Sequence, residues 1–371
     1  MIKRSLLKIP TFIFLIVFLL SCRNSNKPLP PKTASNALDE LVQSAPFQYL
    51  NLDNIKTRLI TLQKDDIIYS ISKDISNHET KFGHFTRFEK IGDQFLVYDG
   101  VVNSIYSIDL SGNVNGPFTR EGRGPGEHGN VGNLKANNKF IYVSDEVNAR
   151  INVYNHKFNP IGQIDSLSNF LDTNNTIFAM HNKNSTGFAP INSQEGLITL
   201  SFIDNVSDTF STILPRIVPE HTHPQIYNIS RASINDKNTI LANYYFLPWF
   251  IIYHNSIHIQ TLIIKYSKFD KMNIPRFEIF KQLGNQGFGG VKPITEYKLM
   301  DNGDIFFSIR TELFHLTKSS DNFSYKLVGK YQFLSPKSLK LLWIVDIFQS
   351  KKEDEFLVGS WEYLFRIDVS D

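Results

Sequence analysis

The chain has 371 residues, of which 42% are hydrophobic and 20% are charged, and its formal net charge is only +3. This composition is too apolar for a disordered chain. The balance of 39 basic and 36 acidic residues, without a long basic run, does not indicate nucleic-acid binding. The single cysteine, Cys22, excludes an intrachain disulfide.

The N-terminus has the features of a secretory signal segment. Three basic residues, Lys3, Arg4 and Lys8, precede an apolar run over residues 9–20. This run is shorter than the about 20 residues that a helix needs to span a bilayer. We therefore predict a signal peptide over residues 1–21.

The residues around Cys22 resemble the lipobox of bacterial lipoproteins. The run Leu-Leu-Ser-Cys ends at this cysteine, which in that family carries acyl chains such as palmitate and becomes the first residue after cleavage. The resemblance implies lipidation of Cys22 and stable anchoring in a membrane, for which two or more acyl chains suffice. Arg23 follows in place of an aspartate, which implies the outer membrane, facing the periplasm or the surface. The alternative is a free cysteine beside an ordinary cleavage site.

The next segment, residues 22–46, is rich in Asn, Ser, Lys and Pro. Such a composition suits a flexible tether that has no core of its own. We predict one folded domain over the remaining residues, 47–371, because a strand pattern repeats along them.

This repeat consists of short apolar strands rich in Phe, Tyr and Ile. Asp99 and Asp145 hold equivalent places in the first two copies, 46 residues apart (145 − 99 = 46). A period in the forties with short strands inside it is typical of a β-propeller blade. Further copies contain residues 195–202, 238–253, 301–316 and 355–367. Six copies predict an all-β fold, a six-bladed β-propeller.

The last copy lacks one strand. After Leu341 the chain supplies strands only at residues 342–348, 355–360 and 362–368, whereas a propeller blade usually has four. An unassigned strand at residues 57–62 precedes the first copy. We therefore predict that this N-terminal strand closes the last blade and protects its edge.

A glycine-rich stretch over residues 120–129 separates the first two copies. Its Gly-x-Gly-Pro-Gly-Glu motif at residues 122–127 resembles a signature of NHL-like and TolB-like six-bladed propeller lipoproteins of Gram-negative bacteria. The resemblance extends over the lipobox, the closing strand and all six copies, although only this motif is specific. Because those families are mostly of unassigned function, the resemblance implies a fold and a location more than a chemistry.

The same stretch is a candidate ligand-binding site formed by Arg120, Arg123, Glu127 and His128. Glycines expose backbone N–H groups, which together with the two arginines could bind an anion. A phosphate loop would continue through Lys-Ser or Lys-Thr into a helix, and this sequence does not. We favour the structural alternative, in which the glycines permit positive φ, Pro125 fixes the turn and Glu127 accepts backbone hydrogen bonds.

Two short patterns could indicate catalysis or metal binding. His221 and His223, preceded by Glu220, have the spacing of metal ligands on a strand, but flanking prolines favour a surface loop and no third ligand is evident. Ser70 and Lys73 fit Ser-x-x-Lys, although the partner motifs of that enzyme class are missing. We expect neither pattern to form a site, and we predict no metal and no catalytic residue.

Two further features have structural and functional readings. Asp99 and Asp145 each follow an apolar strand, where repetition favours turn formers that bond their own backbone. Carboxylates facing a central channel could instead hold Ca²⁺, but the later copies lack them. The aromatic stretch at residues 244–250 could line a sugar or peptide groove, yet Pro248 favours a β-hairpin whose aromatic side chains pack in the core.

Two classes of function follow from this reading. We favour a non-enzymatic binding scaffold, anchored to the cell envelope through Cys22, for a protein or a glycan. The alternative is a hydrolase or lactonase with a metal in the central channel, as in some six-bladed propellers. For the scaffold we expect a monomer, no cofactor and no nucleic-acid partner. A chelator-sensitive activity would favour the enzyme.

Overall fold

The computed structural model describes residues 44–71, 82–136, 139–164, 230–272, 293–319, 323–350 and 355–369, apart from positions 146, 149, 236, 238, 245, 246, 256 and 337. Between residues 165 and 229 it describes only the backbone of four strands. The signal segment, Cys22, most of the tether, His221, His223 and Lys73 lie outside the described residues. No helix within the described ranges is long and apolar enough to cross a membrane.

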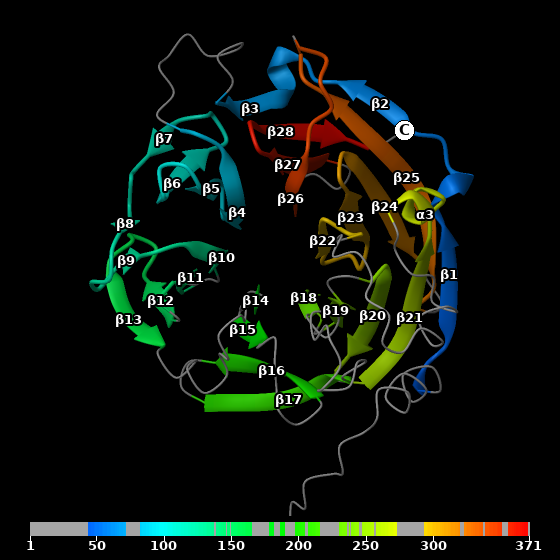
Figure 1. Cartoon of the computed structure of the whole chain (residues 1–371), viewed down its shortest axis with the longest axis horizontal. Coiled ribbons are helices and arrows are strands. Elements are labelled where there is room, and N and C mark those ends of the chain that lie inside the picture. Colours follow the sequence, from blue (N-terminus) through cyan, green and yellow to red (C-terminus); the bar gives the residue numbers. More distant parts are fainter. Residues whose placement is uncertain are drawn as a thin grey trace, which may run out of the picture. The chain divides into compact units, whose positions relative to one another are not determined.

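The described strands form six sheets of four or five strands and one two-stranded ribbon. Within residues 33–371, which form one compact unit, the sheets follow one another around a ring (Figure 1). The first strand of each sheet contacts the first strand of the next, in the cyclic order β4, β10, β14, β18, β22, β26 and back to β4. A radial array of antiparallel sheets is an all-β propeller, as predicted.

Each sheet is a meander of neighbouring strands. The first two are β4 (Phe85–Ile91), β5 (Gln94–Asp99), β6 (Ser104–Asp109) and β7 (Val114–Asn115), and then β10 (Val131–Ala136), β11 (Ile141–Asp145), β12 (Arg150–Tyr154) and β13 (Pro160–Ile164). The next two are β14 (Phe178–His181), β15 (Thr186–Ala189), β16 (Leu197–Asp204) and β17 (Ser207–Pro215), and then β18 (Ser230–Ile234), β19 (Thr239–Tyr244), β20 (Trp249–His254) and β21 (Ile257–Lys265). The last two are β22 (Glu296–Leu299), β23 (Ile305–Ile309), β24 (Glu312–Lys318) and β25 (Tyr325–Leu334), and then β26 (Ile344–Gln349), β27 (Glu355–Ser360) and β28 (Tyr363–Asp368). A short helix, α3 (Lys268–Lys271), follows β21.

The core lies between neighbouring sheets, so the second strand of a sheet is buried on both faces. All six residues of β19 and five of the six in β5 are buried, which explains why these strands read as continuous apolar runs. The first and last sheets share such a core: Phe88 of β4 packs where Gly359 of β27 leaves room, and a Cβ there would lie 2.7 Å from the ring. This contact helps to close the ring.

Three N-terminal strands complete the last three sheets, and one of them closes the last sheet as predicted. This closing strand is β3 (Ile67–Ser70), which pairs antiparallel with β28. The predicted closing strand at residues 57–62 was the wrong one: it is β2 (Arg58–Thr61), which pairs parallel with β25 on the preceding sheet. β1 (Phe47–Asn51) pairs in the same way with β21. An apolar pattern identifies a strand but not its neighbour, which caused the error.

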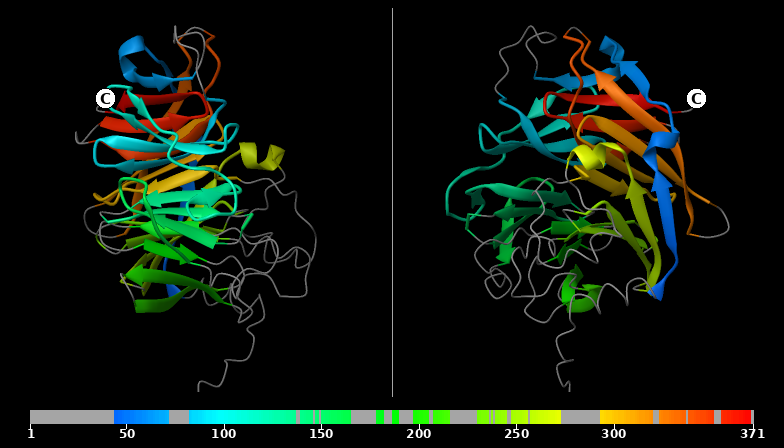
Figure 2. Two further views of the ribbon diagram at one scale, coloured as in Figure 1. Left: turned by 90° about the vertical axis from the view of Figure 1, so that its left-hand side faces the viewer. Right: turned by 45° about the vertical axis from the view of Figure 1, so that its right-hand side comes forward.

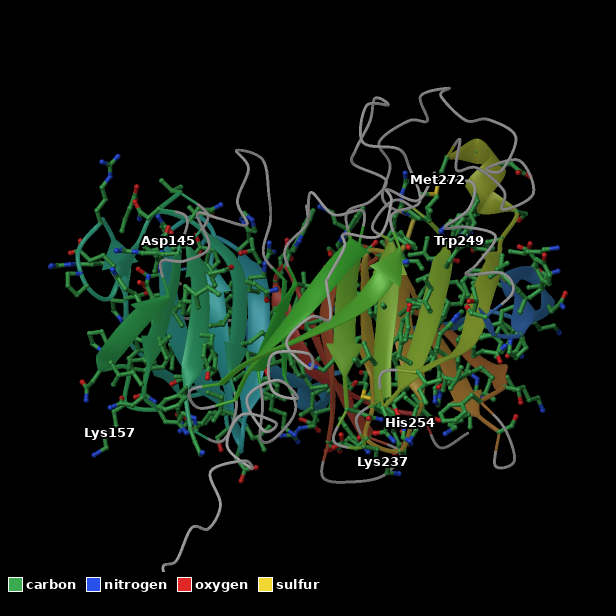
Figure 3. All side chains as sticks on the ribbon, turned by 90° about the horizontal axis from the view of Figure 1, so that it is seen from below. Asp145, Lys157, Lys237, Trp249, His254 and Met272 are labelled. Atoms are coloured by element: carbon green, nitrogen blue, oxygen red, sulfur yellow. The ribbon has the colours of Figure 1, made fainter. Side chains whose placement is uncertain are left out.

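The hairpin predicted over residues 244–250 is confirmed. β19 ends at Tyr244 and β20 begins at Trp249, and both aromatic side chains are completely buried. Figure 3 shows Trp249 at the same edge of the propeller as Asp145, with Lys157, Lys237 and His254 at the opposite edge. We call the first edge the connection face, because it carries the β5–β6 and β11–β12 turns and the glycine-rich stretch between the first two sheets, whose Gly129 amide donates to Asp145. Figure 2 shows the two edges from the side.

Candidate functional site

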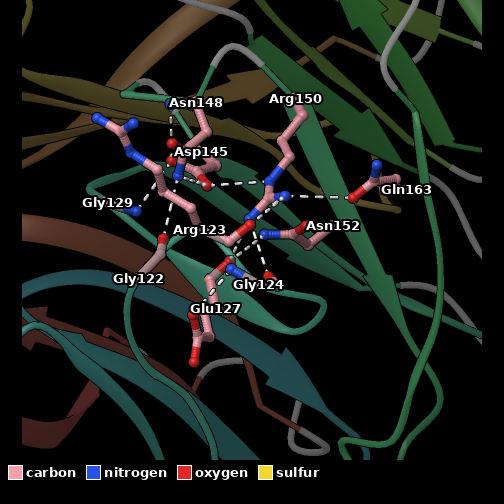
Figure 4. A network of polar contacts seen from close by, with 10 residues as sticks. All are labelled: Gly122, Arg123, Gly124, Glu127, Gly129, Asp145, Asn148, Arg150, Asn152 and Gln163. Carbon is pink, nitrogen blue, oxygen red and sulfur yellow. Dashed lines mark hydrogen bonds and ion pairs between the residues drawn. The ribbon is translucent and has the colours of Figure 1, made fainter.

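The glycine-rich stretch lies on the connection face and joins β7 to β10 (Figure 1), and Figure 4 shows its polar contacts. It contains two short strands, β8 (Arg120–Glu121) and β9 (Glu127–His128), which pair parallel with each other. The amide of Gly122 donates to the carbonyl of His128 at 3.1 Å. Gly126 has a φ of 76°, in the left-handed region that favours glycine. Residues 122–126 therefore form a closed turn.

The carboxylate of Glu127 folds back against this turn. It accepts hydrogen bonds from the amide of Gly124 at 2.8 Å and from Nε of Arg120 at 2.7 Å. These donors, with the Gly124 amide as the largest cause, hold the pKa of Glu127 below its ordinary value. A Cβ at Gly122 would collide with the carboxylate, and one at Gly124 would come within 2.9 Å of it. The turn thus contains an anion of its own.

Arg150, a buried residue of the next sheet, donates hydrogen bonds to carbonyl groups of the glycine-rich stretch. Its guanidinium donates to the carbonyl oxygens of Arg123 at 3.0 Å, Gly124 at 3.1 Å and Glu127 at 2.9 Å. Its Nε also forms an ion pair with Asp145 at 3.2 Å. One arginine therefore ties the glycine-rich stretch to β12.

Three neutral side chains of the same sheet complete the network in Figure 4. Asn148 donates to the carbonyl of Gly122 at 3.1 Å, and Asn152 donates to the carbonyl of Glu127 at 2.9 Å. Gln163 accepts from the guanidinium of Arg150 at 3.2 Å. Sequence reasoning missed these residues and Arg150. The available signal was that Arg150 replaces Ser104 of the preceding copy of the repeat.

The four predicted ligand-binding residues do not converge on one point. Arg120 is 82% exposed and is paired with Glu127. Arg123 is exposed, and Figure 4 shows its side chain extending away from Arg150. His128 is completely buried: its Nε2 contacts Oγ1 of Thr119 at 2.8 Å, and burial lowers its pKa. These contacts agree with the structural alternative, in which the stretch forms a turn and Glu127 accepts a backbone hydrogen bond.

The repeated aspartates are turn formers, as predicted. Asp99 accepts from the amides of Gly83 at 2.6 Å and Val101 at 2.8 Å. Asp145 accepts from the amide of Gly129 at 3.0 Å and from that of Asn148 at 3.2 Å. Each carboxylate thereby joins a turn to the connection that precedes its own sheet. Within the described ranges, no group of three or more His, Cys, Asp or Glu side chains could hold a metal.

Charged side chains meet where the first strands of four sheets approach one another. Lys135 of β10 forms an ion pair with Glu89 of β4 at 2.9 Å. The charges of Lys135, Glu89, Lys298 and Glu296 all act on Asp346 of β26, whose pKa burial raises to about 6. We name these five residues the axial charge cluster. It contains three carboxylates and two ammonium groups.

A pair of tryptophans forms an aromatic surface on the connection face. The rings of Trp343 and Trp361 stack with centroids 5.3 Å apart and planes 13° apart. Trp361 lies in the β27–β28 turn and is 47% exposed, and the ring of His84 lies 6.2 Å from it. Sequence reasoning missed this pair, because two complete strands, β26 and β27, separate its members along the chain.

No protein-family model matches the chain, and no curated protein matches it. Among solved structures, an exported protein of Bacteroides fragilis is 12% identical over 84% of this chain and 99% of that chain, with a TM-score of 0.51. Virginiamycin B lyase from Staphylococcus aureus is 9% identical over 79% of this chain and 86% of that chain, with a TM-score of 0.44. PorZ, a surface component of the type-IX secretion system of Porphyromonas gingivalis, is 8% identical over 78% of this chain and 37% of that chain, with a TM-score of 0.41. At such identities the likeness concerns the fold alone, a β-propeller found in exported bacterial proteins.

Proposed function

We propose that the protein is a non-enzymatic binding scaffold for a protein or a glycan, built on a six-bladed propeller and anchored to the outer membrane through lipid on Cys22. The observation that carries the binding role is the Trp343–Trp361 pair. The rings are stacked on each other, yet one of them remains half exposed on the connection face. Exposed apolar surface on a folded domain often marks an interaction site, and tryptophan is enriched at the centres of interfaces.

The framework suits such a role. Six sheets in one cyclic order support a six-bladed ring, and the ordered sheets hold the turns of the connection face in place. A preordered aromatic pair loses little conformational freedom when a ligand binds, which favours affinity. Binding sites are commonly placed on loops that a rigid scaffold positions.

Location follows from the N-terminal sequence, and the fold likeness to an exported bacterial protein supports it. Replacing Cys22 with Ala should release the protein into the soluble fraction or leave its signal segment uncleaved. Intact-mass analysis of the wild-type protein should show acyl chains on Cys22. A mass without them would contradict the anchor and leave the binding role standing.

The binding role is tested with labelled full-length protein and isolated cell envelopes. The Trp361→Ala variant should bind at least about tenfold more weakly than wild type, because it loses the exposed ring. Ile257→Ser is the matched control, since Ile257 is an exposed apolar residue (67%) at the start of β21, away from the tryptophans. Equal binding of all three proteins would exclude the tryptophan pair as the binding site.

A further inference from the structure

The tryptophan pair is one end of a longer apolar surface. Val101 and Val102, in the β5–β6 turn, are 64% and 42% exposed, and Val147, in the corresponding β11–β12 turn, is 62% exposed. Together with Trp361 and Trp343 they define the apolar strip. These turns belong to the last, first and second sheets, which are consecutive around the ring. The strip therefore crosses three adjacent sheets on the connection face.

The same arrangement of a glycine, an aspartate and a valine holds Val101 in the first sheet and Val147 in the second. Val101 packs on Gly83 and Val147 packs on Gly129, and a Cβ at either glycine would collide with the valine side chain. The amide of each glycine donates to the aspartate that shapes the valine's own turn, at 2.6 and 3.0 Å. Both sheets thus present an ordered, exposed valine at the equivalent position.

The strip is continuous between the tryptophans and the first valine. His84 follows Gly83, and its ring lies 6.2 Å from that of Trp361. The amide of Phe85 donates to the carbonyl of Trp361 at 3.0 Å, so the two sheets are joined by a backbone hydrogen bond at this point. Trp361 and Val101 therefore belong to one ordered surface.

Exposed charges of both signs lie in the described turns and connections of this face. Around the strip they are Arg120, Arg123 and Lys340, with Glu121 and Glu362. Arg120 is paired with Glu127, whereas the guanidinium of Arg123 has no ion pair with any residue that the structure describes. Arg123 lies beside the turn that carries Val147, because Asn148 of that turn bonds the adjacent Gly122. A free positive charge thus flanks the strip.

We propose that the apolar strip is the docking surface for a protein partner whose contacting segment carries an aromatic or aliphatic side chain flanked by carboxylates. This inference rests on the proposed scaffold function and names the class of its partner. Valine methyl groups offer no hydrogen bonds to the hydroxyl groups of a glycan, so burial against one would leave polar groups unpaired. An aromatic or aliphatic side chain of a protein partner loses no such bonds, and the carboxylates that flank it complement the charge of Arg123.

The test selects peptides from a phage-displayed library of random linear peptides on full-length wild-type protein alone, without prior removal of any phage. Selected peptides should combine an aromatic or aliphatic residue with Asp or Glu. A synthetic peptide of that kind should bind Trp361→Ala and Val147→Ser at least about tenfold more weakly than wild type. Ile257→Ser and Leu59→Ser, which change equally exposed residues outside the strip, should bind it as wild type does. Unfolding curves show which variants are folded.

A parallel screen of the same proteins on an array of neutral and acidic glycans separates the two levels of the proposal. Glycan binding that requires Trp361, without peptide selection, would overturn the protein partner and leave the scaffold function standing. Peptides that bind Trp361→Ala and Val147→Ser as tightly as wild type would place docking elsewhere and overturn the strip. An absence of both peptide and glycan binding would contradict the strip and the scaffold function together.

Discussion

The glycine-rich stretch and the apolar strip lie on the same face of the propeller. They differ because the polar groups of the stretch bond one another, whereas the side chains of the strip remain largely exposed. In the stretch, Arg150 bonds three carbonyl groups, and Glu127 bonds an amide and a guanidinium of its own turn. In the strip, Trp361 and Val147 remain about half exposed. The conspicuous polar motif therefore makes its contacts within the fold, whereas the surface that we propose for a partner consists of inconspicuous apolar residues beside it.

The largest effect should come from removing the centre of the polar network. Arg150→Ala leaves the buried Asp145 carboxylate without its ion pair and the carbonyls of the stretch without donors. We expect a loss of about 3–5 kcal/mol in the free energy of unfolding, measured by urea denaturation. The matched control, Arg123→Ala, removes an exposed charge and should cost no more than about 0.5 kcal/mol. If Arg123→Ala lowered the free energy of unfolding more than Arg150→Ala does, the polar network around Arg150 would not be what stabilises the glycine-rich stretch.

A smaller loss should follow from disturbing the backbone of the same turn. Gly126 has a φ of 76° and lies against Pro160, so Gly126→Val should cost about 1–3 kcal/mol in strain. Gly162→Ala is the control, because no atom lies within 4 Å of the added Cβ and its backbone is ordinary. Urea denaturation of both variants measures the difference. Equal stabilities would mean that the turn tolerates side chains and that its glycines have another purpose.

Much of the propeller could be predicted because each copy of the repeat carries its own signal. Asp99 and Asp145 mark the same turn in two sheets, and the buried second strands show as apolar runs. The partners of the N-terminal strands could not be predicted, since β2 and β3 differ in their neighbours rather than in their pattern. The network at Arg150 and the stack of Trp343 on Trp361 depend on side chains that meet only after the ring has closed.

The axial charge cluster tests whether partly buried charged groups in this propeller can also be costly. Burial raises the pKa of Asp346 to about 6, so the folded state binds a proton more readily than the unfolded chain between about pH 4 and pH 6. Stability should therefore fall as the pH rises through this range. Asp346→Asn should remove this dependence and raise the free energy of unfolding at pH 7 by about 1–2 kcal/mol. Destabilisation of this variant at pH 7 would show that its ion pairs outweigh burial.

The smallest change in stability should follow from substitution in the apolar strip. Trp361→Ala removes one stacked ring whose surface is half exposed, so the free energy of unfolding should fall by at most about 1 kcal/mol. The buried counterpart, Trp249→Ala, should cost about 3–5 kcal/mol in the same thermal or urea experiment. A loss of free energy of unfolding as large as that of Trp249→Ala would mean that the exposed pair stabilises the protein as core residues do. The strip and the glycine-rich stretch would then no longer differ in this respect.

The central claim is that the glycine-rich stretch already holds its anion, the Glu127 carboxylate, and binds no other. The most direct measurement is the melting temperature of wild type and of the Arg120→Ala, Arg123→Ala double variant, with and without phosphate. Phosphate stabilises folded proteins in general by exclusion from their surface, so we predict the same small rise in both proteins. A phosphate-dependent rise that appears in wild type and vanishes in the double variant would contradict the claim.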